Sequence, residues 1–433
     1  MSIVTPRIAS GFPEYLPEDQ MEFNRLRSII EETYQKYGFS PIDTPDLELK
    51  EVLLAKGGGE TDQQVYEFTR GRNDFVMRFD LTVPLARYAA EHQNELVFPF
   101  RRYHIGKVHR AERAQAGRFR EFYQCDIDVI GTNSPLVDAE FPAIISEVFE
   151  RFNFGEFVVR INDRRILNGF FKHIGLDECK SEVMRVVDKV EKLSKQEFSD
   201  TLVKVGLDDE QISKLASFTS ITGDNDQVLA ALSELGIDDS DFVEGLKNLT
   251  TVINTLRLFG VSEKRFRLDL KIARGLDYYT GTVYETNLVD YPELGSVCSG
   301  GRFDDLAGHY TTTNLPGVGI SIGLSRLFYK LKEIGVIESA KKTPATVVVL
   351  PLSEAEFDIA IQASAVLRTA NVSNILYTEL NNLKKKLRYA DQMGFDYAVI
   401  IGETERLNDG VMVKNLSNGD SKFVKLADLA DMV

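Results

Sequence analysis

The chain contains few of the residues that build disulfide frameworks or metal sites. Its three cysteines, Cys125, Cys179 and Cys298, lie far apart and form no CxxC pair. We therefore expect a reducing compartment, the cytoplasm, and neither disulfides nor a thiolate zinc site. Among the five histidines, His104 and His109 lie beside arginines, which disfavours a metal ion. No metal site built from fixed His or Cys ligands is expected.

Long apolar runs are missing as well. No stretch of 18 apolar residues occurs, so we expect no membrane-spanning helix. The N-terminal residues lack a basic segment followed by an apolar one, so no signal peptide is expected. The formal net charge is −15, whereas nucleic-acid binders are usually basic. The total charge therefore counts against a nucleic-acid binder.

The charge is unevenly distributed along the chain. Residues 174–255 carry eight Lys and Arg against seventeen Asp and Glu, a net charge of −9. Residues 98–131 carry seven against four, a net charge of +3. The acidic segment has helical periodicity and no apparent chemistry, which predicts an inserted helical subdomain. The candidate site is expected in locally basic surroundings.

The length of 433 residues exceeds a single core and favours two or three domains. Residues 18–37 have the apolar spacing of an amphipathic helix. Beyond residues 341–345, strand and helix patterns alternate, which predicts a compact α/β domain of about 90 residues. Residues 384–388 form its only basic cluster, and either a solvated helix face or an RNA-binding patch would explain it.

One stretch, KIARGLDYYTGTVYE, places a cation, a carboxylate and two phenols within six residues: Arg274, Asp277, Tyr278 and Tyr279. Residues 268–273, which overlap its start, and TVYET, which overlaps its end, have strand character. A strand edge of this kind can present an anion-binding fork and phenol hydroxyls to a pocket. A half-buried strand with amphipathic tyrosines is the alternative.

A second informative stretch, residues 97–131, predicts strands at residues 103–110 and 119–130. The period of two puts Phe122, Gln124 and Asp128 on one face, together with Asp126. An aromatic ring, an amide and a carboxylate in a row form a recognition surface. Upstream, Asp80 at a strand-to-helix junction could hold an ammonium group or cap the helix.

Glycines mark two further segments. Residues 300–304 read as a tight turn with a charged pair. Residues 315–327 read as a glycine-rich strand followed by a helix with Arg326 in its first turn. GVGISIG differs from GxGxxG, which argues against a dinucleotide fold. Glycines in a strand instead indicate close backbone approach, here to a flat ring.

Together these segments resemble the histidyl-tRNA synthetase family of class II aminoacyl-tRNA synthetases over nearly the whole chain. RGLDYYTGTVYE resembles its histidine signature and GGRFDDL the companion signature. VHRAER and GRFREFYQ resemble class motif 2, and GVGISIGLSRL resembles motif 3. Residues 18–45 resemble motif 1, which builds the class dimer interface.

The resemblance implies an α/β (α+β) fold with three parts. These are a catalytic domain built on an antiparallel sheet flanked by helices, a helical insertion, and a C-terminal α/β anticodon-binding domain. We expect catalytic segments at residues 1–170 and 256–335, the insertion at 171–255, a linker at 336–345 and the last domain at 346–433.

The implied activity is ATP-dependent ligation of L-histidine to tRNA(His) through a histidyl-adenylate, with Mg²⁺, in a cytoplasmic homodimer. One alternative is a non-catalytic, histidine-binding regulatory subunit of ATP phosphoribosyltransferase. Such paralogues usually lack the C-terminal domain and degrade the phosphate-binding arginines, whereas Arg110, Arg118, Arg274 and Arg326 are all present here. A class II synthetase for another amino acid would share the class motifs but not RGLDYYTG.

By resemblance, Asp80, Thr82 and Gln124 hold the ammonium of histidine, and Asp128 and Tyr279 bind its ring nitrogens. Phe303 stands where the family often has Tyr, so one hydroxyl near the pocket is missing. The full set implied for histidine is Asp80, Leu81, Thr82, Arg110, Gln124, Asp128, Arg274, Tyr278 and Tyr279; for ATP it is Arg110, Glu112, Arg118, Phe122, Gly323 and Arg326; Arg110 and Arg274 are catalytic, and Gln115 contacts tRNA.

Overall fold

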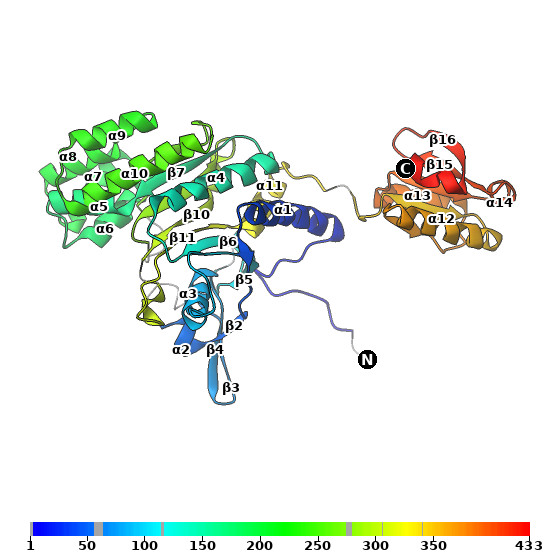
Figure 1. Cartoon of the computed structure of the whole chain (residues 1–433), viewed down its shortest axis with the longest axis horizontal. Helices are drawn as coiled ribbons and strands as arrows, with labels where there is room; N and C mark the ends of the chain where they lie inside the picture. The colour runs from blue at the N-terminus through cyan, green and yellow to red at the C-terminus, as the bar shows by residue number, and fades with distance from the viewer. Residues whose placement is uncertain (1–2, 56–63, 114–116, 274–278, 305, 340) are drawn as a thin grey trace. The chain divides into compact units, whose positions relative to one another are not determined.

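The computed structural model describes residues 3–55, 64–113, 117–273, 279–304, 306–339 and 341–433 (Figure 1). The chain divides into two compact units. The first contains residues 1–13 and 26–336, and the second contains residues 14–25 and 337–433. Within the described residues, no helix combines the length and the apolar character that crossing a membrane requires.

A large sheet forms the centre of the first unit. Its six inner strands are antiparallel, while the short edge strands β1 and β8 pair in parallel with their neighbours. The expected antiparallel sheet flanked by helices is therefore confirmed, with parallel edges added. Across the sheet the order is β1 (Ser40–Pro41), β5 (Phe100–His109), β6 (Glu121–Ile130), β11 (Gly317–Ile322), β10 (Ser296–Phe303), β9 (Thr282–Leu288), β7 (Phe157–Asp163) and β8 (Phe266–Leu268).

A small three-stranded sheet precedes Asp80 in the chain. Strands β3 and β4 form a hairpin in which Arg70 pairs with Asn73, so the turn is Gly71-Arg72, with Gly71 at φ +67°. The chain then enters α3, whose start follows Asp80. The elements are β2 (Leu47–Leu49), α2 (Lys50–Leu53), β3 (Glu67–Arg70), β4 (Asn73–Met77) and α3 (Thr82–Glu91).

Helices cover the large sheet and build the acidic segment, where α6 to α9 lie together in green in Figure 1. Side-chain caps explain several helix starts: Ser194, Asp208 and Asp224 each accept a hydrogen bond from the third helical amide. Residues 174–255 are helical between their loops, as expected. The helices are α1 (Pro17–Lys36), α4 (Pro135–Phe152), α5 (Arg164–His173), α6 (Lys180–Val187), η2 (Val190–Lys192), α7 (Lys195–Val205), α8 (Asp209–Thr219), α9 (Asn225–Glu234), α10 (Ser240–Leu258), η3 (Pro292–Leu294), η4 (Ala307–His309) and α11 (Leu324–Glu333).

Two local predictions were wrong. The strand expected at residues 268–273 ends at Leu268, because the Asp269 carboxylate accepts a hydrogen bond from the Lys271 amide and turns the chain. The turn expected at residues 300–304 is instead the end of β10. Its charged pair also differs, since Arg302 bonds to the buried Asp138 of α4.

The C-terminal unit contains a five-stranded sheet in the order β13-β12-β14-β15-β16. Its first three strands are parallel, and β15 and β16 continue antiparallel. The compact α/β domain expected from the alternating pattern is confirmed. Helix α12 packs on one face and α13 on the other. The short helix α14 was not predicted. The elements are β12 (Val347–Pro351), η5 (Glu354–Glu356), α12 (Phe357–Thr369), β13 (Asn374–Leu376), α13 (Leu383–Met393), α14 (Glu403–Leu407), β14 (Tyr397–Ile401), β15 (Gly410–Asn415), β16 (Ser421–Lys425) and η6 (Leu426–Met432).

Candidate active site

A cavity of about 440 Å³ opens on one face of the large sheet. Strand β6 supplies its floor, because alternate residues from Phe122 to Asp128 point to the same side. The cavity is lined by Asp80, Thr82, Arg110, Glu112, Gly117, Arg118, Phe119, Phe122, Gln124, Asp126, Asp128, Tyr279, Tyr284, Glu285, Ser296, Val297, Cys298, Ser299, Gly300, Phe303, Gly319, Ile320, Ser321, Gly323, Arg326 and Leu327.

Most residues predicted for the site meet in this cavity, although they come from separate segments. Leu81 does not line it: its side chain is buried, and its carbonyl oxygen accepts a hydrogen bond from Arg102. Gln115, Arg274 and Tyr278 lie outside the described residues. The predicted residues that line the cavity are Asp80, Thr82, Arg110, Glu112, Arg118, Phe122, Gln124, Asp128, Tyr279, Gly323 and Arg326.

Three buried aspartates give one end of the cavity a concentrated negative charge. Burial raises the pKa of Asp80 and of Asp128 to about 6 and that of Asp126 to about 7, and Arg102 opposes the rise in all three. Asp80 also accepts a hydrogen bond from the Val83 amide at 3.1 Å, so it caps α3 while lining the cavity. A cationic ligand would relieve the repulsion among these carboxylates.

An amide acceptor lies beside this carboxylate end. Gln124 Nε2 donates to Ser321 Oγ at 2.8 Å, which fixes the orientation of the amide. Gln124 Oε1 is buried and has no hydrogen-bond partner among the described residues. A buried acceptor of this kind is costly unless a ligand supplies a donor, and an ammonium group would do so.

Guanidinium groups and an aromatic ring occupy the other end. Phe122 precedes Asp128 by six strand residues, roughly 20 Å along β6. Arg118 Nη1 lies 3.8 Å from Glu112 Oε2, and Arg326 Nη2 donates to the Leu294 carbonyl at 2.9 Å. Burial and the neighbouring Arg118 lower the pKa of Arg326. Cations held this close together suit a polyanion.

Arg110 lies between the two ends. Its guanidinium carbon is 5.2 Å from the centroid of the Phe122 ring, and its Nε donates to the Phe79 carbonyl at 3.0 Å. From the same position its charge lowers the pKa of Asp80. Arg110 can therefore contact an anionic group where a ligand at the carboxylate end meets a ligand at the aromatic end.

Glycines make room for the side chains of the carboxylate end. A Cβ on Gly319 would overlap the Asp128 carboxylate, and one on Gly301 would lie 3.0 Å from the Tyr279 ring. A Cβ on Gly317 would overlap the Phe303 ring. Gly317 thus leaves room for the Phe303 ring and Gly319 for the Asp128 carboxylate, while the flat ring expected near GVGISIG stays a prediction.

Four residues of this region received no role from the sequence. Asp126 was placed on the correct face of its strand, so alternation gave a signal for it. Ser321 follows from the same alternation along β11. Glu285 closes the TVYE segment, and burial raises its pKa. The sequence gave no signal for Arg102. Arg101 beside it is also an arginine, although its side chain points to the opposite face of the strand.

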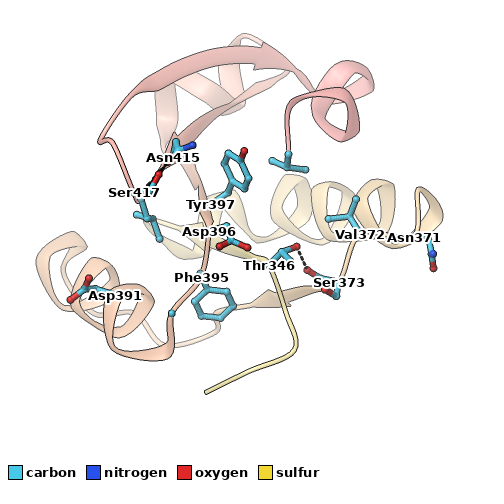
Figure 2. A pocket seen from close by; sticks show the side chains of 13 residues that line it. Thr346, Asn371, Val372, Ser373, Asp391, Phe395, Asp396, Tyr397, Asn415 and Ser417 are labelled. Carbon is cyan, nitrogen blue, oxygen red and sulfur yellow. Dashed lines mark hydrogen bonds between the residues drawn. The ribbon is translucent and has the colours of Figure 1, made fainter. Parts of the chain in front are cut away.

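A second cavity, of about 690 Å³, lies in the C-terminal unit (Figure 2). Its polar groups bond to one another: Thr346 Oγ1 donates to the Ser373 carbonyl at 3.3 Å, and Ser417 Oγ donates to Asn415 Oδ1 at 2.6 Å. No residue predicted for the site lines it. The candidate active site is therefore the cavity of the first unit.

The basic cluster of the C-terminal unit lies on α13. Lys384 and Lys385 are exposed, but Lys386 is fully buried and donates to the Pro351 carbonyl at the end of β12. Arg388 is exposed as well, so a solvated helix face describes this cluster except at Lys386. Burial lowers the pKa of Lys386.

The antiparallel sheet with this cavity, joined to a separate α/β domain, defines an aminoacyl-tRNA synthetase of class II type. Residues 11–327 match the family model described as histidyl-tRNA synthetase, and residues 346–433 match the one described as anticodon binding domain. The chain therefore belongs to the histidyl-tRNA synthetase family.

Individual relatives agree with this assignment. The chain is 47% identical to the histidine–tRNA ligase of Clostridium tetani, covering 100% of this chain and 98% of the relative. It is 41% identical to that of Finegoldia magna, covering 99% of both. The crystal structure of histidyl-tRNA synthetase from Nostoc sp. PCC 7120 has a TM-score of 0.93 at 41% identity and 99% coverage of both chains. A Bacillus halodurans structure described as an ATP phosphoribosyltransferase regulatory subunit/histidyl-tRNA synthetase shares the fold at 20% identity, with a TM-score of 0.77, over 92% of this chain and 99% of that one.

Proposed function

We propose that the cavity of the first unit binds histidine at its carboxylate end and ATP at its aromatic and guanidinium end. As a member of the histidyl-tRNA synthetase family, the chain is a histidine–tRNA ligase that uses ATP. The observation that carries the proposal is Arg110, which lies between the two ends. There the histidine carboxylate and the α-phosphate of ATP must meet for the reaction to occur.

The histidine end selects its ligand by charge and hydrogen bonding. Asp80, Thr82 and Gln124 accept hydrogen bonds from the α-ammonium group. This group supplies Gln124 Oε1 with a hydrogen-bond donor. Asp128 and Tyr279 take the two ring nitrogens, because a carboxylate and a phenol can satisfy both at once. Leu81 supports this end through its backbone, and Tyr278 belongs to the proposed set by resemblance.

The ATP end positions a triphosphate. Phe122 stacks on adenine, while Glu112, Arg118 and Gly323 hold the nucleotide and Arg326 contacts the terminal phosphate. Planar guanidinium groups match phosphate oxygens in two-point contacts.

In the first step, the histidine carboxylate attacks the α-phosphorus in line and pyrophosphate leaves. Arg110 and Arg274 stabilise the charge that develops on the α-phosphate, so no protein general base is needed. In the second step, the terminal ribose hydroxyl of tRNA attacks the adenylate carbonyl and AMP leaves. Gln115 and the C-terminal domain are proposed to contact tRNA(His).

Magnesium fits the donors of the cavity as an ion that arrives with ATP. Within the described residues, no three His, Cys, Asp or Glu side chains converge on a metal site. This suits Mg²⁺, which usually keeps substrate phosphates, waters and one or two carboxylates as ligands. Glu112 and Glu285 line the cavity and could hold it. When bound, it would neutralise phosphate charge.

The remaining proposals concern organisation and location. A homodimer follows from the resemblance to motif 1, and the domain boundaries are proposed at residues 170, 255, 335 and 345. The reducing cytoplasm is proposed from the few, widely spaced cysteines of the sequence.

Transfer of labelled histidine to tRNA tests the second half of the reaction. The protein should charge a tRNA(His) transcript with histidine in the presence of ATP and Mg²⁺, and it should not charge a tRNA for another amino acid. A protein that forms the adenylate but charges no tRNA would contradict the proposed ligase function.

A further inference from the structure

A buried arginine lies beneath the carboxylate end of the cavity. Arg102 of β5 is fully buried, with a relative exposure of 0%. Its Nη2 lies 2.7 Å from Asp128 Oδ2 and donates to the Leu81 carbonyl at 3.0 Å. One nitrogen thus contacts both the carboxylate proposed for the histidine ring and the backbone between Asp80 and Thr82.

The burial of this guanidinium is poorly compensated by hydrogen bonds. Its Nε and Nη1 have no hydrogen-bond partner among the described residues. Burying a charge costs free energy of desolvation unless the charge is paired. Removing one partner of a buried pair leaves the other charge buried without compensation. The compensation for Arg102 therefore comes mainly from the charge of the surrounding carboxylates.

Arg102 in turn stabilises the charged form of the neighbouring carboxylates. Asp80 and Asp128 both raise the pKa of Asp126, and Asp80 raises that of Asp128, while Arg102 lowers the pKa of all three. Without it, protonation at neutral pH would convert acceptors for the ligand into partial donors.

We propose that Arg102 is a positioning residue for histidine: it fixes the Asp128 carboxylate and the loop of Asp80 and keeps these groups charged to receive the ligand. The inference rests on the proposed function, because it assigns Arg102 to the histidine end of that site. Arg102 does not line the cavity, so its role is to position other residues.

The surroundings of Arg102 identify the groups that would set the pH dependence. The pKa of His104 on the same strand is lowered to about 3 by burial, then by Arg102 and Arg78, so this ring stays neutral in the working range. The titration of histidine itself is common to all variants, so any difference in pH dependence between the wild type and a variant at Arg102 should come from the aspartates. The charged or titratable groups around Arg102 and its aspartates include Asp126, Asp128 and Cys125 from β6, Asp80 from the segment before α3, His104 from β5, Tyr34 from α1 and Cys298 from β10 near Asp126, Arg78 near His104, and Arg110 and Tyr310 near Asp80.

The test compares substitutions at two adjacent arginines. Arg102→Met removes the cation and keeps an unbranched side chain, while Arg102→Lys keeps the charge without the planar fork. Arg101→Met is the matched control, because Arg101 points to the other side of the strand and pairs with Glu140 at 2.7 Å. Each full-length variant is assayed for KM of histidine and of ATP in pyrophosphate exchange, and for histidine affinity by calorimetry without ATP.

We expect Arg102→Met to raise the KM and the dissociation constant for histidine by about tenfold or more at pH 7, with KM for ATP within about twofold. The loss should grow at pH 6.5 and shrink at pH 9, where the aspartates ionise without help. Arg102→Lys should recover part of the loss, and Arg101→Met should resemble the wild type in both constants.

Several results would overturn the inference. One is an Arg102→Met variant whose KM, dissociation constant and pH profile for histidine equal those of the wild type. Another is a KM for ATP that rises as much as the KM for histidine. If Arg102→Met does not fold, Arg102→Lys decides, since a purely structural role predicts no selective change in histidine affinity. A wild-type protein without histidine-dependent exchange would instead refute the proposed function, whatever Arg102 does.

Discussion

Replacing Gly319 by alanine should damage the histidine end of the cavity and leave its ATP end intact. In β11, Gly319 pairs with Asp128 on one side and Gly301 on the other. An added Cβ would overlap the Asp128 carboxylate and would lie 2.5 Å from the Ile127 carbonyl oxygen. The carbonyl belongs to the neighbouring strand, so it cannot move without disturbing the sheet.

The magnitude follows from this geometry. Overpacking of a rigid site costs about 1–3 kcal/mol of the free energy of unfolding. The carboxylate must also shift, and a displacement of about 1 Å in a positioned group can lower kcat/KM by about 100-fold. We expect that loss for histidine, with KM for ATP changed by less than about threefold.

Urea unfolding and pyrophosphate exchange measure the two effects separately. Gly323→Ala is the matched comparison, since a Cβ there meets no atom within 4 Å and the backbone φ is −77°. It should change the free energy of unfolding by less than about 0.5 kcal/mol. Wild-type stability and wild-type kcat/KM for histidine in Gly319→Ala would refute the reasoning.

Three further predictions concern other parts of the first unit. Asp138→Asn should lower the free energy of unfolding by about 3–5 kcal/mol, because it leaves the buried Arg302 without its counter-ion; a loss below about 1 kcal/mol in urea unfolding would contradict this. Asp126→Asn should become progressively more stable than the wild type as pH rises from 5 to 8. Burial raises the pKa of Asp126 to about 7, so the native state binds this proton more tightly than the unfolded chain does. The free energy of unfolding of the wild type therefore falls as the pH rises toward and through the folded-state pKa of about 7. The difference should reach about 2–4 kcal/mol by thermal unfolding without histidine, and a pH-independent difference would contradict it. Arg326→Ala should raise KM for ATP by about tenfold with little change in KM for histidine, since it removes the contact proposed for the terminal phosphate; a rise in KM for histidine alone in exchange kinetics would contradict this assignment.

The strand bearing the site could be predicted because its side chains alternate strictly. Phe122, Gln124 and Asp128 are separated by two and four positions. In a strand, residues at even separations point to the same face, so the three side chains must lie together. The helices within residues 174–255 were equally accessible from their periodicity. Local patterns of this kind require no knowledge of which strands pair.

Features that depend on pairing could not be predicted. Gly300 and Gly301 have the composition of a turn, and only the register of β10 against β9 and β11 shows why a strand requires them. Arg101 and Arg102 are indistinguishable in sequence, and the packing of the sheet decides which one is buried. The burial of Lys386 likewise depends on how α13 packs on its sheet.

Pyrophosphate exchange with ATP, run with each of the twenty amino acids in turn, tests most directly whether one cavity joins histidine to ATP. The account predicts that histidine alone supports exchange in the wild-type protein. Exchange driven by a different amino acid, or histidine that binds without supporting exchange, would contradict it.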